Sequence, residues 1–123
     1  MVKYASGLKA REEIIGQAAS EMVTQSLKDI SPVMDDYIKL TFGQMKADET
    51  LDLKQRELIV LTTLLTQGDT APQLKIHMQG ALNVGLSKAE IIETFVQCLP
   101  YVGFPKVMNA LTVAKDFFAE KED

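Results

Sequence analysis

The residues best suited to chemistry in this chain are its single histidine, His77, and the earlier glutamate Glu57. Each lies in an apolar pattern with helical spacing, and a short turn at Gly68 and Asp69 separates the two patterns. In an antiparallel helix pair, Glu57 would lie about eleven residues before the turn and His77 about eight after it, so at a rise of about 1.5 Å per residue they differ by about one turn. Such a pair would hold one imidazole tautomer and act as a general acid or base near neutral pH.

Spacing alone leaves structural alternatives open. His77 could be a partly buried, hydrogen-bonded core residue, and Glu57 a first-turn residue favoured by the helix dipole. Gln73 could be the second half of a capping box that begins at Thr70, or it could face a crevice one turn before His77. Cys98 lies among apolar residues, where a free cysteine is typically a small hydrophobic side chain. One histidine without a second nitrogen or sulfur ligand nearby predicts no metal site.

The composition favours a single globular domain over residues 1–123, because 46% of the 123 residues are hydrophobic. The net charge is −4, and the acidic and basic residues are interleaved, which gives no basic patch for nucleic acid or an anionic membrane. One cysteine fits a reducing compartment. The first residues do not resemble a secretory signal, and no apolar run is long enough to span a bilayer. We therefore expect a soluble, cytoplasmic protein.

The first half of the chain predicts two helices. One amphipathic helix is expected from about Lys9 to Leu27, although Gly16 weakens its interior. A second helix is expected from Pro32, after Ser31 as N-cap, to about Phe42. Gly43 should end it, and the stretch GQMKADET should form a polar loop.

The next two helices carry the candidate pair. Asp52 and Gln55 have the spacing of a capping pair before a third helix that is apolar on most sides and so is predicted to be buried. Gly68 should end this helix. Thr70 should cap the fourth helix, with Pro72 in its first turn.

The last third of the chain has the clearest local signals. Gly85 is placed to end the fourth helix in a left-handed conformation. Ser87 and Glu90 predict a capping box that starts a fifth helix, and Pro100 should stop that helix near Leu99. A last helix should follow Gly103. The sequence therefore predicts an all-α protein of about six helices, with no β-period segment.

Several spaced motifs together resemble the carboxymuconolactone decarboxylase family. The match is strongest over residues 51–115. It implies the all-helical fold of the alkylhydroperoxidase D-like proteins, no cofactor, and self-assembly into homotrimers or hexamers. The motifs are Arg56-Glu57-Leu58, Gln73-Leu74-x-x-His77-x-x-Gly80-Ala81-Leu82-Asn83-x-Gly85, Glu90-Ile91-x-Glu93 and Gln97-x-x-x-Tyr101-x-Gly103-Phe104-Pro105-x-x-x-Asn109-Ala110.

The family has two chemistries, and the residues disfavour one of them. The alkylhydroperoxidase branch uses Cys-x-x-Cys-x-x-x-His, but Thr70 and Gln73 stand at the two cysteine positions counted back from His77. Thiol-disulfide exchange needs a thiolate and a resolving thiol. An antioxidant peroxidase activity is therefore not expected.

The decarboxylase branch removes carbon dioxide from a carboxylated γ-lactone. The resemblance implies His77 as the acid that reprotonates carbon and Arg56 as a cation for a carboxylate, with Gln73 and Tyr101 as further substrate-binding residues. Glu57 is the expected catalytic partner of His77 from helix geometry, although the decarboxylases often lack a carboxylate at this position. This chain has Gln79 where the decarboxylases typically carry an arginine. We expect a cofactor-independent lyase or proton-transfer enzyme for a small lactone or carbonyl carboxylate. The alternative is a non-catalytic, oligomeric protein that binds a small ligand.

Overall fold

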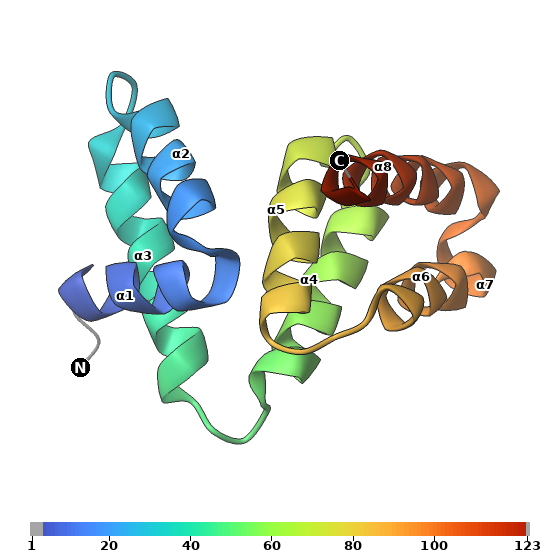
Figure 1. Cartoon of the computed structure of the whole chain (residues 1–123), viewed down its shortest axis with the longest axis horizontal. Helices are drawn as coiled ribbons and strands as arrows, with labels where there is room; N and C mark the ends of the chain where they lie inside the picture. Colours follow the sequence, from blue (N-terminus) through green and yellow to red (C-terminus); the bar gives the residue numbers. More distant parts are fainter. Residues whose placement is uncertain (1–3, 123) are drawn as a thin grey trace. The chain divides into compact units, whose positions relative to one another are not determined.

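The computed structural model describes residues 4–122, and in that range the chain is helical without any strand (Figure 1). The all-α prediction is confirmed. More helices are present than the six or so predicted, because the first predicted helix is divided in two and a short extra helix follows Cys98. The helices are α1 (Tyr4–Ile15), α2 (Gln17–Leu27), α3 (Pro32–Ala47), α4 (Leu53–Gln67), α5 (Ala71–Asn83), α6 (Lys88–Gln97), α7 (Leu99–Val102) and α8 (Phe104–Glu122).

The chain divides into two compact units, Met1–Leu53 and Lys54–Asp123. The first unit contains α1, α2 and α3, and each of these helices packs against the other two. The second contains nearly all of α4 and the helices that follow it. That residues 1–123 form a single domain stays a prediction.

The predicted continuous helix over Lys9–Leu27 is wrong at Gly16. This residue has φ 94° and ψ 155°, a conformation that glycine adopts easily and other residues avoid. The helical path therefore ends at Ile15 and restarts at Gln17. The break lets α2 turn back onto α1, so that Ser20 on α2 meets Arg11 on α1.

The third helix is longer than predicted. Gly43 was expected to end it, but α3 continues to Ala47 and both Phe42 and Gly43 are buried. The helix-ending tendency of a glycine is worth only about 1 kcal/mol, and the packing of α3 against α1 exceeds it. Five of the eight residues in the predicted polar loop, Gly43 to Ala47, are thus helical. The helix begins at Pro32 as predicted, although the side chain of Ser31 makes no capping hydrogen bond.

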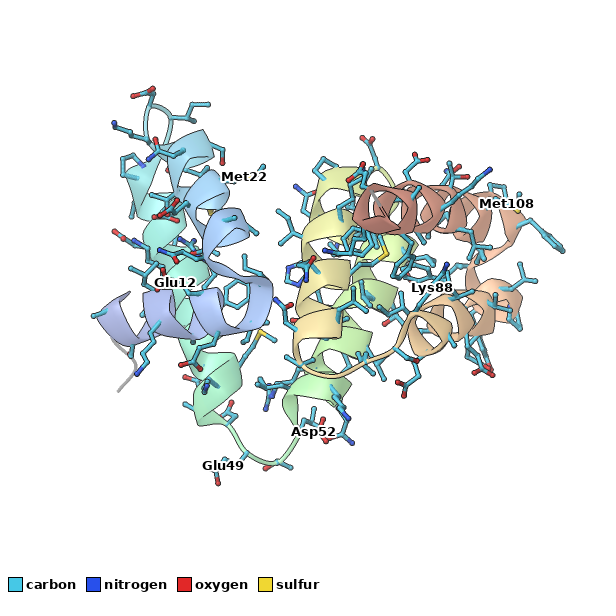
Figure 2. All side chains as sticks on the ribbon, viewed as in Figure 1. Glu12, Met22, Glu49, Asp52, Lys88 and Met108 are labelled. Atoms are coloured by element: carbon cyan, nitrogen blue, oxygen red, sulfur yellow. The ribbon has the colours of Figure 1, made fainter. Side chains whose placement is uncertain are left out.

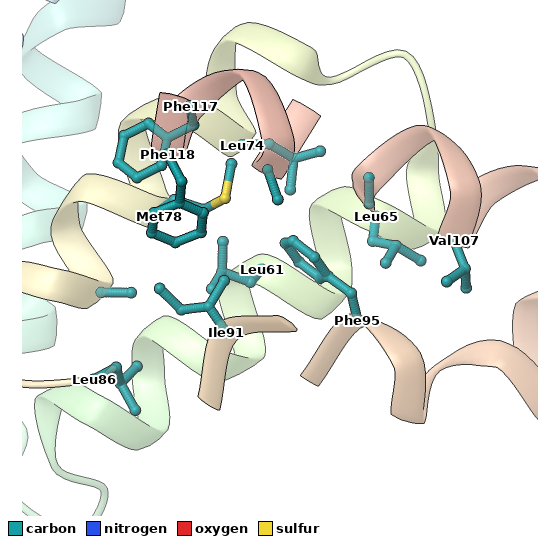
Figure 3. Close-up of a cluster of buried hydrophobic side chains, with 13 residues drawn as sticks. Leu61, Leu65, Leu74, Met78, Leu86, Ile91, Phe95, Val107, Phe117 and Phe118 are labelled. Carbon is teal, nitrogen blue, oxygen red and sulfur yellow. The ribbon is translucent and has the colours of Figure 1, made fainter. Parts of the chain in front are cut away.

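The second unit is built around an apolar core (Figure 3). Leu61 and Leu65 reach it from α4, while α5, α6 and α8 contribute the residues that face them. The predicted last helix has its apolar stripe in this core, apart from the half-buried Leu111. The fully buried members are Leu61, Leu65, Leu74, Met78, Ala81, Leu86, Ile91, Phe95, Val107, Ala110, Ala114, Phe117 and Phe118.

Helix α4 is buried on one side only, which corrects the prediction that it would be buried on most sides. Leu61 and Leu65 are in the core, but Ile59 is 51% exposed. An apolar helix does not need to be enclosed all round, since single exposed hydrophobic side chains are common on protein surfaces.

The predicted end of α5, the start and end of α6 and the start of α8 are confirmed. Gly85 has φ 106°, the left-handed conformation expected after α5. Ser87 and Glu90 form the full capping box, with the Glu90 N–H donating to Ser87 Oγ and the Ser87 N–H donating to Glu90 Oε1. Helix α6 stops at Gln97, just before Pro100, and α8 starts after Gly103.

Over the described residues, no helix is long and apolar enough to cross a membrane.

Candidate functional site

The two candidate side chains meet between α4 and α5. His77 Nδ1 lies 3.1 Å from Glu57 Oε2, which is hydrogen-bonding distance. An ionised carboxylate can only accept, so with Glu57 ionised the Nδ1–H is the donor. The remaining ring nitrogen, Nε2, then becomes the position where the imidazole gains or loses its second proton. The predicted proximity is confirmed, whereas the catalytic role stays a prediction.

The two side chains are brought together across the short turn that joins α4 to α5. The turn between them is short because Gly68 adopts φ 74° and Asp69 adopts φ 56°. Leu61 on α4 lies one turn after Glu57, and Met78 on α5 is adjacent to His77; both side chains are in the core. Core packing on either side therefore fixes the height at which carboxylate and imidazole meet.

The two side chains differ in burial. The Glu57 side chain is 0% exposed, and the His77 side chain is 18% exposed. Glu57 Oε1 has no hydrogen-bond partner within residues 4–122. The site thus combines a fully buried carboxylate with an imidazole that reaches the surface of the second unit.

Thr70 is the N-cap residue of α5 as predicted, but its side chain does not cap the helix, which argues against the capping-box interpretation of Gln73. The Thr70 side chain makes no capping hydrogen bond; its hydroxyl instead donates to the Leu64 carbonyl oxygen at 2.6 Å. Thr70 therefore closes the α4–α5 turn, and Gln73 is not half of a capping box. Gln73 lies one turn before His77 on α5, with an exposed side chain.

The other predicted binding residues differ in burial and in position around the helices. Arg56 is half-buried on α4, and as the neighbour of Glu57 it points about 100° away around the helix. Tyr101 is on α7 with its side chain 83% exposed. Their roles, and a crevice around the pair, stay predictions.

Gln79 stands where the decarboxylases typically carry an arginine, and its side chain hydrogen-bonds to another residue of α5. Its Nε2 donates to Asn83 Oδ1 at 2.8 Å. This neutral side chain supplies no positive charge for a carboxylate. The chain therefore differs electrostatically from a site built for a dianion.

Cys98 is not arranged for thiol chemistry. Its Sγ donates to the Thr94 carbonyl oxygen at 3.4 Å, and the side chain is partly buried against the core. Burial raises the pKa of the Cys98 thiol above its ordinary value of 9.0, so the thiolate is disfavoured. It is the only cysteine in the sequence.

No group of three or more histidine, cysteine, aspartate or glutamate side chains that could hold a metal ion is found among the described residues. The site that the geometry does assemble, an imidazole and a carboxylate, has the groups for proton transfer.

One buried polar cluster was not foreseen from the sequence. Arg11 is fully buried in the first unit, and its guanidinium donates to Asp35 Oδ1, Ser20 Oγ and Thr24 Oγ1, each at 2.7 Å. Lys39 adds an ion pair to Asp35 Oδ2 at 3.0 Å. Arg11 stands in the same helical stripe as the buried Ile14 and Ile15. A charged residue within an apolar stripe is the sequence feature that could have indicated a buried polar cluster.

A comparison with known protein families identifies the class. The sequence model of the carboxymuconolactone decarboxylase family matches residues 32–116, and the chain belongs to this family. Three relatives add detail. An uncharacterised 15.0 kDa protein from the nqo9–nqo10 intergenic region of Paracoccus denitrificans is 33% identical over 97 residues, covering 78% of this chain and 72% of its own.

Two further relatives have names that state a reaction. The 4-carboxymuconolactone decarboxylase of Acinetobacter baylyi is 25% identical over 119 residues, which cover 96% of this chain and 88% of that protein. The nitrosuccinic acid decarboxylase npaB of Metarhizium robertsii is 28% identical over 116 residues, which cover 91% of this chain and 78% of that protein. Family membership and these names support a decarboxylase-like role at the level of the family.

Proposed function

We propose that this protein is a cofactor-independent lyase that removes carbon dioxide from a small carboxylic acid, with His77 as the acid that protonates the product carbon. The main structural support for this proposal is the 3.1 Å contact between His77 Nδ1 and the fully buried Glu57 carboxylate. The names of two relatives support the reaction type, because both describe loss of a carboxyl group from a small organic acid.

The two named substrates share one chemical requirement. When the bond between carbon and the carboxylate breaks, carbon dioxide leaves and its bonding electrons stay on carbon. A lactone carbonyl or a nitro group can delocalise that negative charge, so the protein does not need an electron sink of its own. One proton must then be added to carbon. The group that gave this proton is afterwards reprotonated by water.

The site supplies this proton from the imidazolium. Glu57 Oε2 accepts from Nδ1–H and stabilises the positive ring, and we assign the transfer of the proton to carbon to Nε2–H. The partly exposed edge of His77 allows the ring to be reprotonated by water. A positioned general acid of this kind contributes roughly 10²–10⁴-fold in rate.

The test is carbon dioxide release from 4-carboxymuconolactone and nitrosuccinate in heavy water. We expect one deuterium on the carbon that accepts the proton, which in nitrosuccinate is the carbon that lost its carboxyl group and in the unsaturated lactone is the ring carbon next to the carbonyl. His77→Ala and Glu57→Gln should each lower turnover by roughly 100-fold or more, and the double variant should lose less than the product of the two. Glu21→Gln removes the charge of an exposed glutamate on α2 and is the matched control. Full turnover in a folded His77→Ala protein would contradict the assignment.

A non-catalytic binding protein is the second candidate, and the departures from a dianion site favour it. Gln79 is neutral and Glu57 adds a buried acid, so a substrate with two carboxylates would be bound weakly. Saturable binding of small lactones without any turnover would support this candidate over the lyase.

Self-assembly into a homotrimer or hexamer in the cytoplasm is also part of the proposal. Each unit exposes large apolar side chains, including Met22 on α2 and Met108 on α8 (Figure 2), and such surface supports burial between subunits. The mass in solution tests this, and a monomer at micromolar concentration would contradict it. The others on the first unit are Leu8, Ile30, Val33, Met34, Tyr37 and Leu51, and those on the second are Ile59, Val96, Tyr101 and Phe104.

A further inference from the structure

A hollow of about 360 Å³ lies between α6 and α8 of the second unit, where these two helices pack against each other. Its lining combines two lysines with four apolar side chains, and no acidic residue of the described chain lines it. We call this surface the α6–α8 groove. Its lining residues are Lys88 and Ile92 from α6 and Leu111, Lys115, Phe118 and Ala119 from α8.

The spacing of these residues along each helix produces this lining. Ile92 lies one turn after Lys88 on α6, and Leu111 and Ala119 lie one turn before and one turn after Lys115 on α8. Residues three or four apart share one face of a helix. Each lysine therefore stands in an apolar stripe, and no aspartate or glutamate lies three or four positions from either lysine in the sequence.

The two lysines also lack acidic partners across the groove. The Lys88 ammonium lies 5.2 Å from the centre of the Phe118 ring, which is a cation–π contact. Lys115 makes no ion pair within residues 4–122. Elsewhere in the same unit, Lys75 Nζ lies 2.9 Å from Glu120 Oε1. In a chain with a net charge of −4, the α6–α8 groove is thus a local positive surface with an apolar floor.

These features define the chemistry that the groove complements. Its apolar floor favours hydrocarbon, because burying such surface removes it from water. Its ammonium groups favour an anion, and a singly charged one, since a dianion would cost more to desolvate against an apolar floor. The volume of about 360 Å³ is at the lower end of the range for small-molecule sites.

We infer that the α6–α8 groove binds a small monocarboxylic acid with an apolar body. The carboxylate pairs with Lys115, the cation without a partner in the described chain, and the hydrocarbon lies on Ile92 and Leu111. Lys88, already held over the Phe118 ring, adds a second positive charge. Neither His77 nor Glu57 lines the groove, so this site is separate from the candidate pair and does not depend on the proposed function.

The test compares three ligands: 3-phenylpropionate, 3-phenylpropan-1-ol and acetate. The alcohol keeps the apolar body without the charge, and acetate keeps the charge without the body. Binding is followed from the methyl NMR signals of Ile92 and Leu111. 3-Phenylpropionate should shift both signals and bind roughly fivefold more tightly than the alcohol and roughly tenfold more tightly than acetate.

A lysine variant tests the ion pair itself. Lys115→Gln should weaken binding of 3-phenylpropionate roughly threefold and leave binding of the alcohol unchanged. Lys121→Gln is the matched control, because Lys121 is on the same helix and also lies over a ring, that of Phe117, but does not line the groove. Both lysines are exposed, so both variants should fold.

Equal affinities for the acid and the alcohol, or equal losses from Lys115→Gln and Lys121→Gln, would overturn the inference. Shifts of the His77 ring signals without shifts at Ile92 would place the ligand at the candidate pair instead. If the Ile92 and Leu111 signals shift with rising protein concentration before any ligand is added, a second copy occupies the groove and the inference is wrong. Turnover is not measured, so these outcomes leave the lyase proposal to its own test.

Discussion

Two buried carboxylates, Asp35 in the first unit and Glu57 in the second, differ in how many donors reach them. Asp35 Oδ1 accepts from Arg11 and Thr24, while Oδ2 accepts from Thr24 and Lys39. Glu57 has one partner, His77, and one oxygen without any among the described residues. The first arrangement is complete within its own unit, and the second is complete only when something is added.

The difference separates a structural role from a functional one. A buried charge whose partners are all present holds helices in one arrangement, because removing any partner exposes the others to an unfavourable environment. A buried charge that lacks a partner lowers stability and is retained where the protein binds or reacts. Asp35 should therefore respond to mutation as a structural residue and Glu57 as a site residue.

The units also differ in what surrounds these groups. The first unit has few buried apolar side chains among its described residues, and Arg11 is as fully buried as Ile14 and Ile15. The second has a continuous apolar core reached from α4, α5, α6 and α8. Apolar contacts are not directional, so they tolerate small shifts that a hydrogen-bonded cluster does not.

The largest expected effect is on the first unit, from Asp35→Ala. This variant leaves the buried Arg11 guanidinium without its carboxylate, which should lower stability by about 3–5 kcal/mol. Hydrogen exchange of the amides in α1, α2 and α3 measures it. Asp36→Ala, at the half-exposed neighbouring position, should cost less than about 1 kcal/mol.

A double variant sharpens this result. Arg11→Met combined with Asp35→Leu replaces both charges with apolar groups and should recover much of the lost stability. Equal losses for Asp35→Ala and Asp36→Ala would show that the Arg11 cluster does not hold the unit together.

The second prediction concerns the stability of the first unit at low pH. Burial alone raises the pKa of Asp35, but hydrogen bonds from Arg11, Lys39 and Thr24 more than offset it, so its pKa lies below the ordinary value of 3.8. A carboxyl whose pKa is lower when folded adds stability that is full above pH 3.8 and is lost as the pH falls through the folded value. We expect α1–α3 to unfold first on acidification.

Residue-resolved NMR during an acid titration would follow each helix. Hydrogen bonds from Ser87 also lower the pKa of Glu90 in the second unit, but that side chain is exposed and solvent screens its contribution. Simultaneous loss of the signals of all helices would contradict the predicted order.

The parts of the fold that could be predicted from the sequence depend on neighbours in the chain. Ser87 and Glu90 satisfy each other's backbone groups within one turn, so their pattern identifies the helix start. The Glu57–His77 contact was predictable because one short turn joins the two helices. Arg11 and Asp35 meet only after Gly16 and the α2–α3 turn reverse the chain, and no local pattern encodes that.

Thr70 shows the same limit at short range. Its position favours an N-cap, but the α4–α5 turn brings the Leu64 carbonyl within reach of its hydroxyl, and that contact forms instead. Likewise Glu57 could be identified as a candidate acid, whereas its unpaired oxygen follows from the packing around it.

A smaller effect should distinguish two helix starts, one in each unit. Ser87→Ala removes a side-chain cap that accepts from the Glu90 N–H and should cost about 1 kcal/mol. Ser31→Ala is the matched control, because the Ser31 side chain makes no capping hydrogen bond. Chemical unfolding, with hydrogen exchange in α6 and α3, measures both. A greater loss from Ser31→Ala would reverse the assignment of the two caps.

The smallest expected change in stability is that of Glu57→Gln, and comparing it with Asp35→Asn tests the difference between the two carboxylates most directly. Glu57→Gln and Asp35→Asn make the same chemical substitution, a neutral amide of nearly the same shape. At Glu57 the amide oxygen can still accept from His77 Nδ1, and the buried charge with its unpaired oxygen is gone, so stability should stay within about 0.5 kcal/mol or rise. At Asp35 the same change removes the charge that balances Arg11 and puts an amide NH₂ where donors already point, so we expect a loss of about 1–3 kcal/mol. Chemical unfolding read by hydrogen exchange in α1–α3 and α4–α5 compares them. If Glu57→Gln cost as much as Asp35→Asn, the carboxylate would be a structural partner of His77, and the proton-transfer role would lose its physical basis.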